Sequence, residues 1–192
     1  MIETAKGIPD FQENGYLPHK CYEVTLEEIK EKLVDNFPDS KTRQSRFECF
    51  MRFYKELLEN VKSCIRILID GSFVENNPNP NDIDLVIVID STKYNDYERF
   101  YIDNEFVFKN VLRDEFKPLK EQENFDLIYE SDFYKYGCDF FPLVKEEKDS
   151  RDYINYISMK KYWIRQWGHD RFHVEKGFLN LKVTYEGGAD EI

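Results

Sequence analysis

The sequence predicts an α+β protein in which a mixed β-sheet packs against helices. Two apolar runs, residues 65–70 and 85–89, have the composition of buried strands. Apolar residues recur at helical spacing over residues 40–61, which predicts an amphipathic helix whose stripe belongs to the core. Further strand-like runs follow at 125–129 and 136–144. A chain of 192 residues is long enough for one domain with a substantial core.

The chain is expected to form a single domain over residues 1–192. Residues 1–24 are expected to form an extended arm lying on the domain, because apolar side chains such as Leu17 would otherwise be exposed. Residues 25–145 would form the core of the domain. Residues 146–192 would add a C-terminal extension that contains a helix and a strand.

The helices are predicted from their start and stop signals. Thr25 and Glu28 form a capping box that opens a short helix ending near Asp35. A helix is expected over residues 95–116, with a break near Asp103. Two further elements complete the chain, a helix over 151–166 and a strand over 177–183.

Asp82 and Asp84 begin the second apolar run. Side chains alternate between the two faces of a strand, so these carboxylates point the same way. Two close negative charges repel each other unless a cation binds between them, and hard oxygen ligands favour Mg²⁺ or Mn²⁺. The pair therefore predicts a metal site. In the alternative interpretation, the two acids only solubilise and cap the entry to a core strand.

Gly71 and Ser72 directly follow the first apolar run. Glycine lets backbone N–H groups approach phosphate oxygens closely, and a small hydroxyl group can donate to a terminal phosphate. The pair therefore indicates a phosphate-binding turn. The alternative is an ordinary turn without a ligand.

Together these residues spell G-S-x9-D-x-D, which resembles the signature of the polymerase-β-like nucleotidyltransferase superfamily. The resemblance implies a nucleotidyltransferase-like fold and the transfer of a nucleoside monophosphate from an NTP such as ATP to a hydroxyl group. It also implies that Gly71 and Ser72 contact the β- and γ-phosphates. Asp82 and Asp84 would bind two Mg²⁺ or Mn²⁺ ions.

The resemblance further implies a third carboxylate on a neighbouring strand. Asp139, which lies inside an apolar run, is the better match, and Asp126 is its rival. A lone acid is costly to bury among apolar residues unless a cation or hydrogen-bond donors meet it. In this interpretation Asp139 binds the second metal ion and helps to deprotonate the acceptor.

No lysine or arginine lies between Ser72 and Asp82, so a cation that steadies the triphosphate must come from elsewhere. The C-terminal aromatic-basic stretch is the predicted source, with Lys161 and Arg165 as nucleotide-binding residues. The other candidates are Lys160 and Arg171, and Lys176 belongs to the same stretch without being nominated for this role. The alternative is an amphipathic helix with a solvated charged face.

A weaker resemblance spans nearly the whole chain, through Gly7-Ile8-Pro9-Asp10-Phe11 near the start and Trp167-Gly168-His169-Asp170-Arg171 near the end. These segments are similar to a group of small bacterial nucleotidyltransferase-like proteins. The superfamily includes minimal enzymes of toxin–antitoxin or phage-defence systems that modify a tRNA end or a partner protein, which implies such acceptors here. The second hypothesis is a catalytically inactive fold that acts as a nucleotide- or protein-binding partner, and the third is a structural domain stabilised by Ca²⁺.

The formal net charge of −11 argues against a general nucleic-acid binder, whose binding surface is basic. No apolar run is long enough to span a membrane and no signal peptide is recognisable, so a cytoplasmic location is expected. The four cysteines have no paired spacing, which favours reduced structural thiols. His169 and His173 have the i,i+4 spacing with which two histidines on a helix can bind a metal ion. Because Gly168 directly precedes the pair and no third ligand is in view, they are expected instead to lie at the surface or to contact phosphate.

Overall fold

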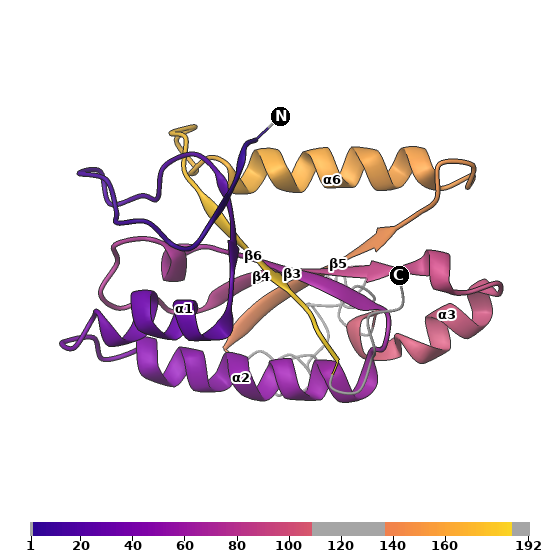
Figure 1. The fold of residues 1–192 in the computed structure, drawn as a ribbon, viewed down its shortest axis with the longest axis horizontal. Helices are drawn as coiled ribbons and strands as arrows, with labels where there is room; N and C mark the ends of the chain where they lie inside the picture. The colour runs from indigo at the N-terminus through magenta and orange to yellow at the C-terminus, as the bar shows by residue number, and fades with distance from the viewer. Residues whose placement is uncertain (1, 109–136, 186–192) are drawn as a thin grey trace, which may run out of the picture.

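Within residues 2–108 and 137–185, which the computed structural model describes, six strands form one mixed sheet (Figure 1). The strands are β1 (Thr4–Lys6), β2 (Cys21–Val24), β3 (Cys64–Asp70), β4 (Ile83–Asp90), β5 (Cys138–Lys145) and β6 (Phe178–Lys182). Their order across the sheet is β1-β2-β6-β3-β4-β5. The mixed sheet and its flanking helices confirm the α+β class at this coarse level.

β3 runs antiparallel to both of its neighbours, β4 and β6, whereas the other adjacent strands are parallel. As a result, the C-terminal end of β3 lies at the same edge of the sheet as the first residues of β4 and β5. This edge is where the Gly-Ser turn and the predicted acids meet.

Helices cover both faces of the sheet (Figure 1). One face carries α1 (Leu26–Lys30), a π-helical turn η1 (Glu31–Asp35) and α2 (Arg43–Asn60). The opposite face carries α6 (Tyr153–Trp167). Because helices lie on both faces, the sheet has one apolar layer between it and α2 and another between it and α6.

The larger apolar layer lies between α2 and the sheet. Phe50, Phe53 and Leu57 of α2 are almost fully buried, and their spacing of three and four residues places them on one helical face. The layer on the other side is smaller and aromatic. There, Trp163 of α6 lies 4.9 Å from Phe141 of β5 between ring centroids.

Local signals explain where several helices begin and end. Thr25 accepts a hydrogen bond from the backbone N–H of Glu28, and the Glu28 carboxylate accepts one from the N–H of Thr25, which confirms the predicted capping box. The helix α3 (Tyr97–Asp103) ends at the predicted break, where Asn104 forms its C-cap. The rest of that predicted helix beyond residue 108, and the predicted strand 125–129, lie outside the described residues.

The remaining predicted elements differ from the structure mainly at their ends. α2 falls within the predicted 40–61, α6 within one or two residues of 151–166, and β6 within 177–183. The N-terminal arm does more than lie on the domain, because it contributes β1 and β2 to the sheet.

In the described part of the chain the four cysteines form no disulfide bond, and Cys21, Cys64 and Cys138 are buried. Across the described ranges no helix combines the length and the apolar composition that a membrane span requires.

Candidate functional site

The Gly-Ser turn follows β3 directly. Gly71 has φ of 78°, a left-handed conformation that favours glycine, and a Cβ atom at this position would overlap Oδ2 of Asp84. Ser72 then opens a short 3-10 turn, η2 (Ser72–Val74). The glycine is therefore required by two independent features, its backbone angle and the close approach of an acidic side chain.

The predicted acids come together beside this turn. Asp84 of β4 is the register partner of Asp139 on parallel β5, so both side chains project from the same face of the sheet. Asp82 precedes β4 by one residue, and its charge acts on Asp84. Asp84 is also opposite Asp70 at the end of β3. This arrangement is the adjacency that the sequence predicted, although the roles of these residues stay predictions.

The acids lie on the face of the sheet that α6 covers. Val86 and Phe141 belong to the apolar layer under α6, and Asp84 and Asp139 precede them by two residues on the same strands. Because side chains alternate along a strand, the acids share that face, one step beyond the end of the apolar layer. Asp84 is consequently half-buried and Asp139 is exposed.

The electrostatics of Asp84 reflect this crowded position. Burial and, after it, the negative charges of Asp82 and Asp139 together raise the pKa of Asp84 to about 6, while Lys176 acts in the opposite direction. A divalent cation between the carboxylates would remove both the repulsion and part of the desolvation cost. The donor set, made only of carboxylate oxygens, fits Mg²⁺ or Mn²⁺.

Lys176 is the cation that the structure places beside the Gly-Ser turn. Its Nζ atom lies 3.0 Å from Oδ1 of Asp70 and 2.8 Å from Oε1 of Glu75. Burial by itself would lower the pKa of Lys176, but the carboxylates of Asp70 and Glu75 outweigh this effect and raise it. Lys176 therefore stays charged and ties the segment before β6 to both sides of the turn.

A second buried cation, Arg43 of α2, organises the loop that follows the turn. Its guanidinium group has no exposed surface and stacks over the Phe37 ring, 3.8 Å from the ring centroid. It donates hydrogen bonds to backbone carbonyl groups on two segments of the chain, those of Leu33, Phe73, Glu75 and Asn77. Burial lowers the pKa of Arg43 to about 10, so the group remains positive at neutral pH.

The basic residues that the sequence nominated lie elsewhere on the C-terminal helix. Lys161 and Arg165 are exposed on α6, whereas Trp163 and Trp167 pack on the sheet. A residue two positions from Trp163 is rotated about 200° around a helix, so both cations project away from the packed side. Lys160 and Arg171 are exposed as well. Nucleotide contacts by Lys161 and Arg165 stay predictions.

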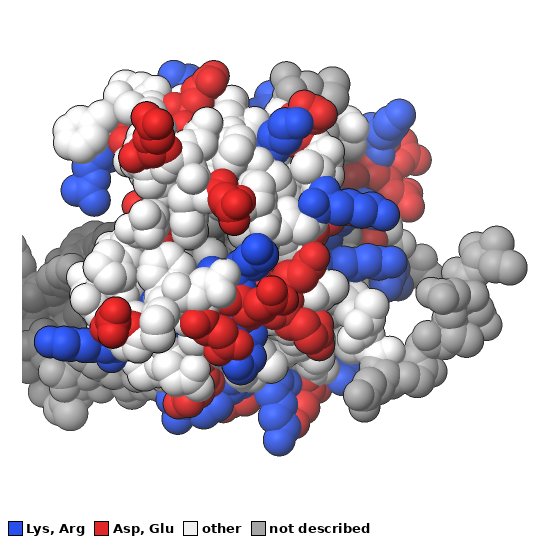
Figure 2. Space-filling model, turned by 60° about the vertical axis from the view of Figure 1, so that its left-hand side comes forward, with Lys and Arg blue, Asp and Glu red and all other residues white. Residues whose placement is uncertain are grey.

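Acidic and basic side chains are interspersed on the face of the molecule in Figure 2, where the described residues form no broad basic surface. Asp126, the rival third carboxylate, lies outside the described residues.

Sequence reasoning missed three residues that shape the site. Asp70 ends the first apolar strand run directly before the Gly-Ser turn, and this position could have drawn attention to it. Arg43 begins a helix among polar residues and has no local signal of burial. Lys176 was one cation among several, and its partner Glu75 is 101 residues away in the chain.

The fold and the site together define a mixed α/β protein with a carboxylate cluster and a buried lysine at one edge of its sheet. The chain matches the model of a family of unknown function, DUF6932, over residues 9–182, and it belongs to that family. No curated protein and no solved structure matches the chain.

Proposed function

We propose that the protein is a metal-dependent nucleotidyltransferase that moves a nucleoside monophosphate from an NTP to a hydroxyl acceptor. The single observation that carries the proposal is the convergence of Asp82, Asp84 and Asp139 beside the Gly-Ser turn. Keeping ionisable carboxylates this close together is unfavourable unless they bind cations. These three residues would hold two Mg²⁺ or Mn²⁺ ions.

The protein residues have distinct roles in the proposed reaction. The acceptor hydroxyl oxygen forms a bond to the α-phosphorus, the bond from that phosphorus to the bridging oxygen breaks, and pyrophosphate leaves. Asp139, the most exposed of the three acids, would take the hydroxyl proton. Bound divalent ions would supply stabilisation of the charge on the attacking and leaving oxygens.

The phosphate groups of the NTP would lie against the Gly-Ser turn. The backbone N–H groups near Gly71 and the hydroxyl group of Ser72 are the available donors. Lys176 would act as a positioning residue, since it binds Asp70 before the turn and Glu75 after it. Arg43 would hold the loop beyond Glu75 through its backbone carbonyl contacts.

A second candidate function is a nucleotide- or protein-binding partner without catalysis. One observation favours it, because the ammonium group of Lys176 already contacts two carboxylates and so offers little charge to a triphosphate. If the protein is instead an enzyme, the exposed cations of α6 would have to complete the phosphate site.

The test is transfer of label from each α-³²P-labelled NTP, with Mg²⁺ or Mn²⁺, to total RNA and to total cell protein. The proposal expects labelling of one acceptor class by the wild type and none by Asp84→Asn or Asp139→Asn, each nearly isosteric. Asp39→Asn, which removes an exposed carboxylate, is the matched control and should label like the wild type. Nucleotide binding without transfer would favour the binding partner, and the absence of both would refute the two candidates.

A further inference from the structure

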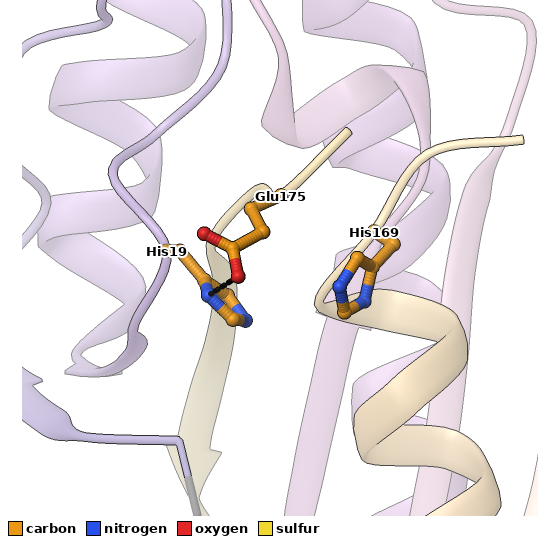
Figure 3. Close-up of side chains that lie close together, drawn as sticks. All are labelled: His19, His169 and Glu175. Carbon is orange, nitrogen blue, oxygen red and sulfur yellow. Dashed lines mark ion pairs between the residues drawn. The ribbon is translucent and has the colours of Figure 1, made fainter. Parts of the chain in front are cut away.

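Two histidines and a glutamate meet where the N-terminal arm crosses the end of α6 (Figure 3). His19 comes from the segment before β2, His169 from the segment just after α6, and Glu175 from the segment before β6. One potential ligand atom from each lies within 4.8 Å of those of the other two. The cluster shares no residue with the proposed active site and contains two of the three histidines of the chain.

The orientation of His169 is determined by its backbone contact. Its Nδ1 atom lies 3.0 Å from the carbonyl oxygen of Arg165. A carbonyl oxygen only accepts hydrogen bonds, so Nδ1 must carry the proton and donate it. The tautomer therefore leaves the lone pair on Nε2, as in metal-binding histidines whose other nitrogen donates to a carbonyl group.

The other two side chains already have the spacing of metal ligands. Nδ1 of His19 lies 3.3 Å from Oε1 of Glu175. Two ligand atoms bound about 2.0–2.1 Å from one tetrahedral zinc ion are separated by about 3.3 Å. His169 would need to approach by at most about 1.5 Å to complete the same geometry. The side chains of His19 and Glu175 are 30% and 66% exposed, so small rotamer changes are open to them.

The backbone around the cluster is held by several independent contacts. His169 and Glu175 form an antiparallel bridge, and the carboxylate of Asp170 accepts hydrogen bonds from the N–H groups of Phe172 and Val174 inside the loop. Tyr16 of the arm donates its hydroxyl proton to the same carboxylate at 2.8 Å. These contacts fix the positions from which the ligands project.

The arm and the loop are also joined directly. Gly177 N–H donates to the carbonyl of Leu17, and Lys176 N–H donates to the carbonyl of Gly168. A Cβ atom at Gly177 would overlap the carbonyl oxygen of Pro18, so the two segments pack without space between them. The ligands are therefore presented by a preorganised framework.

We propose that His19, His169 and Glu175 form a binding site for a transition metal ion of the Zn²⁺ class. Two imidazole nitrogens and one carboxylate oxygen favour Zn²⁺ over Mg²⁺, which prefers oxygen ligands alone. Water would complete the coordination, because the cluster is partly exposed. The ion would clamp the N-terminal arm to the segment that carries Lys176, one residue after Glu175.

The simplest test is isothermal titration of the full-length, tag-free protein with Zn²⁺ after chelator treatment. The titration is done in the Asp84→Asn background, so that the carboxylate site does not contribute and the result does not depend on the proposed catalysis. One equivalent is expected to bind. His19→Ala, His169→Ala and Glu175→Gln should each weaken binding by at least about tenfold. Substitution of Co²⁺ should give the visible absorption of a tetrahedral nitrogen and oxygen site.

His173→Asn is the matched control, since it removes the remaining histidine of the chain and asparagine tolerates the φ of 64° at this position. This variant should bind Zn²⁺ like its parent. Retained binding in both His19→Ala and His169→Ala would overturn the proposal, as would a parent that binds no Zn²⁺. In that case the cluster is only a His19–Glu175 ion pair with an adjacent ring. Far-UV circular dichroism of each variant separates lost ligands from lost folding.

Discussion

Replacing Asp84 with asparagine should stabilise the metal-free protein at pH 8, although Asp84 is central to the proposed site. The carboxylate is half-buried and has two acidic neighbours, Asp82 and Asp139, so its ionised form is unfavourable in the folded state. Asparagine has nearly the same shape and carries no charge. The substitution therefore removes a repulsion and leaves the packing in place.

The magnitude follows from the pKa of Asp84, which burial and the neighbouring acids raise from 3.8 to about 6. A shift of this size corresponds to an upper limit of about 3 kcal/mol in the free energy of unfolding. Because the folded pKa lies above the unfolded pKa, the folded state binds more protons between these values. The stability contributed by protonated Asp84 is complete below pH 3.8 and is lost as the pH rises through about 6.

The assay is urea unfolding in the presence of a chelator, followed by the fluorescence of Trp163 and Trp167, which pack on the sheet. The stability advantage of Asp84→Asn should grow by about 1 kcal/mol or more between pH 5 and pH 8. Asp39→Asn controls for the loss of one exposed charge and should show no such growth. Mn²⁺ should remove most of this advantage, since only the wild type gains binding free energy, about 2.7 kcal/mol at a hundredfold excess over Kd.

The result that would refute this reasoning is a variant less stable than the wild type at pH 8 without metal. A stability difference independent of pH would refute it equally, because Asp84 would then not experience the repulsion inferred from its neighbours.

Three further substitutions test the surroundings of the site. Arg43→Met should lower the free energy of unfolding by about 3–5 kcal/mol, measured by urea unfolding, because it leaves several buried carbonyl groups without donors; a loss under about 1 kcal/mol would contradict this role. Gly71→Ala should abolish the rise in melting temperature that Mn²⁺ with NTP produces, since the added Cβ would overlap Asp84, while the circular dichroism is retained. An unchanged rise in melting temperature would contradict this geometry. Lys176→Met should lower the free energy of unfolding by about 3 kcal/mol, and by more at pH 8 than at pH 5, because it leaves Asp70 buried without its ion pair. Equal losses at both pH values would argue against that pair.

Short-range patterns in the chain were sufficient for several features of the molecule. The capping box at Thr25 and Glu28 involves residues three positions apart, so propensity and hydrogen bonding alone define it. Strand alternation likewise places Asp82 and Asp84 on one face without knowledge of any other strand. The Gly-Ser turn was recognisable because two apolar runs enclose it.

Other features required the topology of the sheet. Asp139 was nominated through a family resemblance, but only the parallel pairing of β4 and β5 makes it the register partner of Asp84. Alternation within β5 is compatible with either face of the sheet. The choice of face depends on which side chains α6 covers, and that is a property of packing between distant segments.

By itself, the sequence determined local features of this protein, namely a Gly-Ser turn after an apolar strand and paired carboxylates on one strand face. Only the tertiary structure decided which cations and ligands join them. Lys176 reaches Asp70 and Glu75, and His19 reaches Glu175, because β6 lies between β2 and β3 in the sheet. The physical reason is that the alternation of residues along a strand tells which face each side chain is on. Which residues it contacts depends on how strands from distant parts of the chain pair in the sheet.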